Sequence, residues 1–514
     1  MKQTLKSNAV DNHDASLSMS GQTMTPDTDF NGAYQNQVGK VLYFHYFSQF
    51  QSQELLVKEV QSFNINESFI LENINVNAFE QAVAGLMARH ESLRTVFQCE
   101  NGEVRQRILT TAECGLPITY FDVRHETDKM EAKDRLGHAC WKTRFDFYRG
   151  PLFKAVVVRV EDTVSWVFLA INHVVCDIYS LYVLREDFYS FYSALAQDTS
   201  PVLPPQLFQA RDYAAWQHKL FDAEDKSGIR KFWIDSLWQD LPRAMLKTFY
   251  KDAAPRVEHA YAAMIEAGLR ADGVKDYQPL ARALNGYCNR PLPTKGSGYS
   301  FCLDEDLFQD FKALSVTLST TMNNLVTTAL SLMVHALTGR TDIILAVSAS
   351  TRDHYKLQRI VGWLMNYMLV RYTLREEHSV ARQVAVNQQT FLKVMPYKHY
   401  PIDYIFRELD ISLDSLGTFF VNYIKHTRDR DDIDPPRHLT GDTIVTADVD
   451  CTVNEFENCF RIFFNYKTEF FLPSTIEFLA QSFLDTCRYM VRNPDEPLWS
   501  LKKNLMENSC TPKS

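Results

Sequence analysis

The chain has 514 residues, of which 46% are hydrophobic and 23% charged, with a net charge of −9 at pH 7. This length exceeds what one hydrophobic core usually holds, so we expect two domains of roughly 150–250 residues each. The acidic balance argues against nucleic-acid binding, because nothing would offset repulsion from phosphates. No apolar run approaches the ~18 residues that a membrane helix needs, which predicts no membrane association.

The ten cysteines are scattered, with no C-x-x-C pair and no Cys/His cluster at metal-ligand spacing. This spacing predicts reduced thiols and no metal site. The first eight residues carry lysines without an apolar stretch behind them, so we expect no secretory signal and a cytoplasmic location. Residues 1–38 are rich in polar residues without periodicity, which is typical of a disordered tail.

The first folded unit is predicted at residues 39–220. We expect order from about Val41, a helix at Gln53–Val60, and a strand around Ser68–Leu71. Asn75 or Asn77 can cap the next helix, because a side-chain oxygen there can accept from a free backbone N–H. That helix carries apolar residues on one face: Phe79, Val83, Leu86 and Met87.

A histidine and an aspartate lie at a junction between a strand and a helix. The apolar run Val164–Ile171 predicts a buried strand, joined as a hairpin to a strand at Leu152–Val160. The apolar spacing in Ile178–Leu195 predicts a helix with one buried face. Between them lie His173 and Asp177. A structural, hydrogen-bonded histidine is one interpretation; a base or positioner for a nucleophile is the other.

The second folded unit is predicted at residues 298–514, after a connector or insertion at 221–297. We expect a strand at Gly298–Leu303 and one long helix at Asp304–Leu337, ended by Thr338-Gly339. A buried strand at Ile343–Val347 leads into the polar loop Ser348–Asp353. Three further elements are predicted: strands at Thr418–Tyr423 and Phe460–Tyr466, and a closing helix at Thr475–Arg488.

Several segments together resemble the condensation domains of nonribosomal peptide synthetases, in the chloramphenicol-acetyltransferase-like superfamily. Asn172 to Ile178 looks like a variant of that family's His-His-x-x-x-Asp-Gly motif. Other segments resemble further family motifs in the expected order: Arg89–Thr95, Arg149–Phe153, Asp212–Gln217, Ser350–Arg352, Val361–Asn366, Tyr400-Pro401 and Asn465–Phe471. The resemblance runs from about residue 41 to 500.

The resemblance implies an α/β fold of two chloramphenicol-acetyltransferase-like lobes in a V, with an active-site tunnel between them. It implies a free-standing acyltransferase that makes an amide or ester in natural-product biosynthesis. The acyl donor is a thioester on the phosphopantetheine arm of an acyl or peptidyl carrier protein, or on coenzyme A. The acceptor is a small amine or alcohol, and no bound cofactor is implied.

The site residues follow from the same motifs. The resemblance implies catalysis by His173, with Asp177 pairing with Arg352 across the lobes and Asn172 fixing the adjoining backbone. Gly362 and Asn366 shape the site. Each of these residues also has a purely structural interpretation. These are a surface salt bridge for Asp177, strand-end hydrogen bonding for Asn172, and a tight backbone contact for Gly362.

The sequence departs from the family motif at two positions. Asn172 replaces the first histidine, and Ile178 replaces the glycine, adding bulk beside the site. These changes favour a rival interpretation, a non-catalytic recruitment domain that binds a synthetase or tailoring enzyme. An epimerase-type relative would need a further acidic motif that is not seen. Cys176 is interpreted as packing, and Arg94 as a structural residue of its own lobe.

Overall fold

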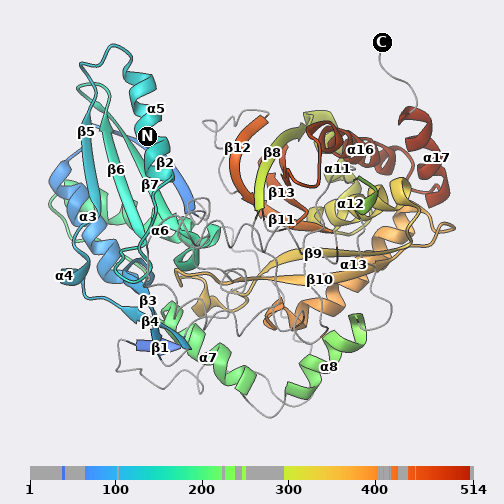
Figure 1. Ribbon diagram of the computed structural model, residues 1–514, viewed down its shortest axis with the longest axis horizontal. Coiled ribbons are helices and arrows are strands. Elements are labelled where there is room, and N and C mark those ends of the chain that lie inside the picture. Colours follow the sequence, from blue (N-terminus) through green and yellow to red (C-terminus); the bar gives the residue numbers. More distant parts are fainter. Residues whose placement is uncertain are drawn as a thin grey trace, which may run out of the picture.

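The computed structural model describes residues 38–40, 64–100, 103–222, 226–237, 246–249, 294–402, 405, 409, 416, 418–426, 438–445 and 447–509. The predicted tail (apart from its last residue), the predicted helix Gln53–Val60 and most of the predicted connector 221–297 lie outside these residues. The described residues form two α/β lobes arranged in a V (Figure 1).

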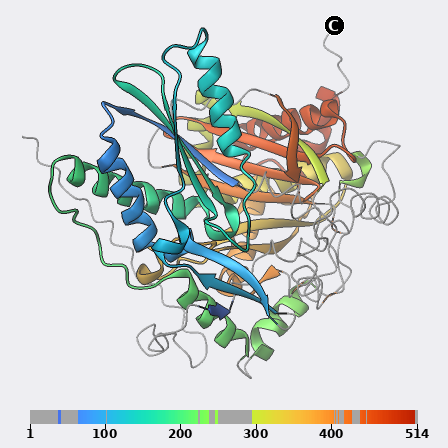
Figure 2. The same ribbon diagram turned by 60° about the vertical axis from the view of Figure 1, so that its left-hand side comes forward.

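The N-terminal lobe is built on a four-stranded sheet in the order β2-β7-β6-β5. Its strands are β2 (Asn64–Glu72), β7 (Val164–Asn172), β6 (Phe153–Arg159) and β5 (Ile118–Asp122). Helices α3 (Val76–Arg89) and α6 (Ile178–Ala196) share a hydrophobic core with one face of this sheet. Helix α5 (Lys129–Trp141) packs on the other face (Figure 2).

Local sequence explains these elements. Asn75 caps α3, with its side-chain oxygen accepting from the Ala78 amide at 3.1 Å, which decides between the two predicted caps. The predicted hairpin is confirmed, because β6 and β7 pair antiparallel. A smaller sheet of β1 (Val38–Lys40), β4 (Glu103–Ile108) and β3 (Thr95–Glu100) adjoins the lobe, with the short helix α4 (Thr111–Cys114) after it.

The C-terminal lobe is built on a seven-stranded sheet in the order β10-β9-β11-β13-β14-β8-β12. Strand β11 pairs parallel with β9 and β13, and the remaining pairs are antiparallel. The strand bounds are β8 Thr294–Leu303, β9 Asp342–Ser350, β10 Met365–Thr373, β11 Phe419–Lys425, β12 His438–Val445, β13 Val449–Glu455 and β14 Phe460–Lys467.

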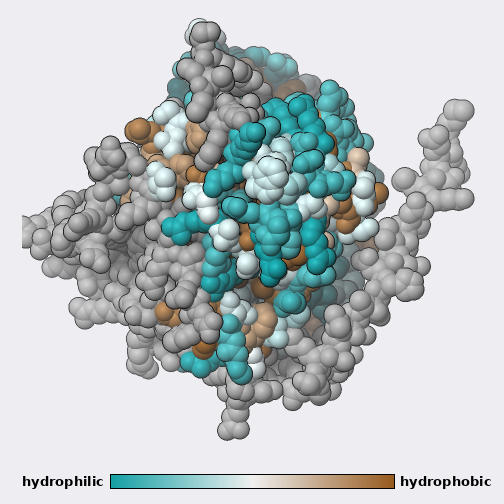
Figure 3. Space-filling view, turned by 90° about the vertical axis from the view of Figure 1, so that its right-hand side faces the viewer, coloured by the Kyte–Doolittle hydropathy of each residue, from teal (hydrophilic) through white to brown (hydrophobic). Residues whose placement is uncertain are grey.

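Helices cover the side of this sheet that lies away from the N-terminal lobe (Figure 1). They are α11 Glu305–Thr317, α12 Met322–Thr338, α13 Val380–Val394, α16 Pro473–Arg492 and α17 Leu498–Ser509. The outer face of this lobe is largely hydrophilic (Figure 3), as expected for helices whose apolar stripes point toward the sheet. Helices α7 (Ala210–Asp222) and α8 (Lys226–Leu237) lie between the two lobes in the chain.

One predicted helix was wrong. Residues Asp304–Leu337 form two helices, α11 and α12, because Ser319 has a backbone φ of 50° and Thr321 caps a new helix by accepting from the Asn324 amide. The predicted helix end at Gly339 is confirmed by its left-handed conformation. Strands β12 and β13 and helix α17 were not predicted. Among the described residues, no helix is both long and apolar enough to cross a bilayer.

The two halves of the chain meet in one shared core. A segment of the C-terminal half, before β10, packs into the hydrophobic core of the N-terminal lobe rather than that of its own lobe. Its buried side chains are Leu357, Ile360, Val361, Trp363 and Leu364. We call residues 357–364 the crossing segment. It brings the C-terminal half against the start of α6, where the sequence predicted a site.

Candidate active site

His173 lies at the turn between β7 and α6. Strand β7 ends at Asn172, one 3-10 turn covers His173–Val175, and α6 begins at Ile178. Asn172 shapes this turn, because its side-chain oxygen accepts from the Val174 amide at 3.1 Å. Its side-chain nitrogen donates to Asn64 on the neighbouring strand β2 at 3.2 Å. The contacts of Asn172 are therefore those of a residue that fixes the backbone beside the histidine.

The His173 ring is half-buried and lies against an aromatic ring of the crossing segment. Its centroid is 4.0 Å from that of Trp363, which donates from its own indole nitrogen to the Met365 carbonyl. Burial lowers the pKa of His173, and the charge of Asp177 opposes this effect only in part. The imidazole is therefore neutral at pH 7 and able to accept a proton.

Asp177 forms the predicted ion pair with Arg352, and the pair is buried. The Arg352 Nη1 atom donates to Oδ2 of the carboxylate at 2.6 Å, and Nη2 donates to Oδ1 at 3.0 Å. The side chains of Asp177 and Arg352 are 3% and 2% exposed, so this is not a surface salt bridge. Two-point pairing of this kind fixes geometry as well as charge.

Both partners of this pair also bind the crossing segment. Asp177 Oδ2 accepts from the Leu364 amide at 2.9 Å, and Arg352 donates to the Ile360 and Gly362 carbonyls at 3.1 Å. Ser180, in the first turn of α6, donates from its amide and its hydroxyl to Asp177 Oδ1, and its hydroxyl oxygen accepts from the Gly362 amide. Neither Ser180 nor the Trp363 contact was predicted from the sequence. A serine three residues after a capping aspartate was the available signal for the first.

The remaining site-shaping residues have structural contacts. A Cβ on Gly362 would lie 2.9 Å from the Ala210 Cβ atom, so only glycine fits there without a shift. Asn366 donates to the Lys398 and Tyr400 carbonyls, which ties β10 to the segment that follows α13. Ile178 is half-buried and packs against the core of the N-terminal lobe.

Cys176 and Arg94 have the structural roles that the sequence predicted for them. Cys176 is fully buried, and burial raises the pKa of its thiol, which therefore stays protonated. Arg94 donates to the carbonyls of Met87 and Leu109 within its own lobe.

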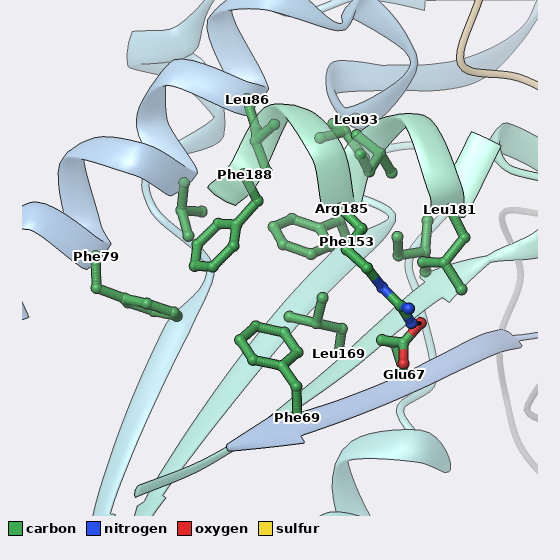
Figure 4. A pocket seen from close by; sticks show the side chains of 13 residues that line it. Glu67, Phe69, Phe79, Leu86, Leu93, Phe153, Leu169, Leu181, Arg185 and Phe188 are labelled. Atoms are coloured by element: carbon green, nitrogen blue, oxygen red, sulfur yellow. Dashed lines mark hydrogen bonds and ion pairs between the residues drawn. The ribbon is translucent and has the colours of Figure 1, made fainter. Parts of the chain in front are cut away.

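A separate apolar cavity lies inside the N-terminal lobe, between α3, α6 and the sheet (Figure 4). Phenylalanine and leucine side chains line it, and Arg185 on α6 donates to Glu67 on β2 at one end. Its volume is about 30 Å³, which is too small for an acyl group. It is therefore a packing defect rather than part of the site at His173.

Comparison with known proteins agrees with this geometry. The condensation domain family matches residues 47–285 and 287–506, which is most of the chain. A linear gramicidin synthase protein of Brevibacillus parabrevis is 23% identical over 437 residues, covering 83% of this chain and 5% of that protein. Phosphinothricin tripeptide synthetase PhsC of Streptomyces viridochromogenes is 24% identical over 455 residues, covering 85% of this chain and 38% of that protein. The chain thus spans a minor part of these relatives.

Solved structures share the fold. The X-domain from teicoplanin biosynthesis has a TM-score of 0.69 at 16% identity, covering 91% of this chain and 98% of that one. The starter condensation domain of rhizomide synthetase RzmA, as a mutant in complex with C8-CoA and Leu-SNAC, has a TM-score of 0.67 at 15% identity, covering 90% and 96%. A two-lobed fold of the chloramphenicol-acetyltransferase type is therefore present. The chain belongs to the condensation domain family of nonribosomal peptide synthetases.

Proposed function

We propose that this chain transfers an acyl group from a phosphopantetheine thioester to an amine or hydroxyl acceptor, forming an amide or an ester. The observation that carries the proposal is the placement of His173, a neutral and half-buried imidazole on a turn that a buried ion pair holds in position. A thioester is already activated, so alignment of two substrates and exclusion of water supply most of the rate.

The step balances without a bound cofactor. The acceptor's nitrogen or oxygen bonds to the thioester carbonyl carbon, and the carbon–sulfur bond breaks. His173 accepts the acceptor's proton or positions it by a hydrogen bond, and the proton leaves with the thiol. Cys176 is excluded as a covalent nucleophile by its buried, protonated thiol.

The donor we propose is an acyl or peptidyl carrier protein, with coenzyme A as the other source of the same thioester. The related RzmA domain was solved with C8-CoA, which supports a thioester donor for this fold. The phosphopantetheine arm arrives with the donor, and the acceptor is a small amine or alcohol.

A second candidate is recruitment without catalysis. Its support is the X-domain relative, which was also solved as a complex with OxyB from teicoplanin biosynthesis. Asn172 in place of a motif histidine is consistent with this role. His173 favours catalysis, because a surface used only for binding has no need of an imidazole held with a lowered pKa.

The test is an assay of the purified protein with acyl-loaded carrier protein, acyl coenzyme A, and a panel of small amines and alcohols. Product is read by mass spectrometry for the parent, His173→Ala, and His125→Ala, an exposed histidine in a loop of the same lobe. Product that is lost only in His173→Ala supports acyl transfer. Absence of product with every acceptor, together with tight binding of a synthetase component, would establish recruitment instead.

A further inference from the structure

A polar cluster lies on the face of the C-terminal sheet that the helices leave uncovered. Along β13 the side chains alternate: Val449, Cys451 and Val453 are buried in the lobe's core, whereas Asp450 and Thr452 are half-buried on the opposite face. Asp450 is flanked on the same face by Phe420 of β11 and Asn465 of β14.

This face is turned toward the N-terminal lobe. Asn454, four residues after Asp450 on the same face, bonds to one ring nitrogen of His426 at 2.8 Å. The other ring nitrogen of His426 lies 2.9 Å from the hydroxyl of Tyr182 on α6. Strand β10, which follows the crossing segment, contributes Tyr367 to the cluster. The cluster is therefore on the side of the sheet where His173 lies.

The cluster has one carboxylate in excess. Asp448 and Lys467 pair at 3.5 Å and are each about 1% exposed, so their charges offset one another. Asp450, two residues from Asp448, has no such partner within salt-bridge distance in the part of the chain that the structure describes. When Asp450 is ionised, these three groups carry a net charge of −1. A single bound cation would neutralise it.

Two adjacent acceptor atoms lack a donor. The Oδ1 atom of Asn465 is buried and has no hydrogen-bond partner among the described residues, and the adjacent, half-buried Asp450 carboxylate accepts no hydrogen bond from those residues. A buried acceptor without a donor costs roughly 1–3 kcal/mol. Aromatic rings border this pair: Tyr367 lies 4.6 Å from Phe420 between ring centroids, and its hydroxyl donates to Asn422 at 3.0 Å. Aromatic faces and a carboxylate together favour an organic cation.

We propose that Asp450 and Asn465 form a recognition site for a protonated primary amine carried by a substrate. An ammonium group has three N–H donors on one positive charge, so it satisfies both acceptors and neutralises the excess carboxylate. The inference deepens the acyl-transfer proposal and rests on it for the identification of the ligand as a substrate. The amine belongs either to the acceptor or to the acyl group of the donor.

The electrostatics of the cluster agree with this assignment. Burial raises the pKa of Asp450 to about 7, and the nearby charge of Lys467 opposes the increase. Burial also raises the pKa of Tyr367, and the charge of Asp450 adds to this increase. A bound ammonium would favour the ionised carboxylate, so binding of an amine that stays protonated in this pH range strengthens as the pH rises through about 7.

The test measures binding without acyl transfer, so that failure of the proposed function is not mistaken for failure of the site. Ligand-observed NMR titrations use two pairs of probes. For an acceptor amine, 4-aminobutan-1-ol is compared with 1,4-butanediol, which has a hydroxyl in place of the ammonium group and no positive charge. For a donor amine, an alanyl N-acetylcysteamine thioester is compared with its N-formyl form, which has no positive charge.

Each probe is titrated into the full chain as the parent, as Asp450→Asn, and as Thr452→Val, a nearly isosteric change on the same face of β13. We expect one pair to show a preference for the amine of about tenfold or more, lost in Asp450→Asn and kept in Thr452→Val. The pair that responds identifies the source of the amine. Equal binding within both pairs, or a preference that survives in Asp450→Asn, would overturn the proposal.

Discussion

Asp177 and Arg352 lie 175 positions apart in the chain and form one buried, two-point ion pair. Desolvation alone would raise the pKa of Asp177. The adjacent guanidinium and the donors of Ser180 reverse this effect, so the pKa is lowered and the carboxylate stays charged at neutral pH. Because each partner also binds the crossing segment, the pair joins the start of α6 to the C-terminal half. Asp177, the member of the pair at the start of α6, lies four residues after His173.

The first prediction concerns the cost of breaking this pair. Arg352→Met leaves a buried carboxylate without its cation, so we expect a loss of about 3–5 kcal/mol in the free energy of unfolding, measured by urea titration. The control is Lys231→Ala, which breaks an exposed pair with Asp235 on α8 and should cost less than about 0.5 kcal/mol. Similar costs for the two variants would contradict the interpretation.

The second prediction concerns the pH dependence of catalysis. Since burial lowers the pKa of His173 below its ordinary value of 6.5, the imidazole stays neutral at mildly acidic pH. We expect kcat/KM to remain flat as the pH falls through 6.5 and to decline only below it. His173→Gln should reduce kcat by about 100-fold or more. A decline centred at or above pH 6.5 would show that the histidine is not in the described environment.

Some features of the site can be predicted from neighbouring residues in the sequence, and others depend on residues far away in the chain. The strand before His173 and the helix after it follow from apolar periodicity, and the structure has both. The partner of Asp177 has no local signal, because a separation of 175 residues leaves no periodicity to detect. Arg352 was identified through the family resemblance alone. The break at Ser319 was missed because apolar spacing continues on both sides of it.

The cluster around Asp450 was missed for a related reason. The alternation in Val449–Glu455 is a strand pattern, but a polar residue in an alternating strand normally points to solvent. Only the pairing of β13 with β11 and β14 shows that Asp450 lies beside Phe420 and Asn465. The roles of single residues in a sheet face thus depend on strand order, which is a property of the whole lobe.

The third prediction tests the close approach of backbone at Gly362. A methyl group there would lie 2.9 Å from the Ala210 Cβ atom and 3.1 Å from a Leu364 methyl carbon. Gly362→Ala should therefore cost about 1–3 kcal/mol in unfolding free energy and reduce acyl transfer, because the crossing segment must shift. Gly228→Ala on α8 meets nothing within 4 Å and should be neutral or stabilising. Equal stability of the two variants would refute this packing argument.

The fourth prediction separates the charge of Asp450 from any ligand. The folded-state pKa of about 7 lies above the ordinary value of 3.8, so the folded protein holds this proton more tightly than the unfolded chain does. The resulting stability is fully present below about pH 3.8 and is lost as the pH rises through 7.

Asp450→Asn removes that loss, because an amide does not ionise. We expect the variant to gain stability relative to the parent as the pH rises from 5 to 8, by up to a few kcal/mol, since one pKa unit corresponds to about 1.4 kcal/mol. Urea midpoints at pH 5, 6, 7 and 8 measure the difference, with Thr452→Val as the variant whose offset should not depend on pH. An offset for Asp450→Asn that is constant across this range would mean that water or a fixed counter-ion already compensates the carboxylate. The excess charge on which the amine site depends would then be absent.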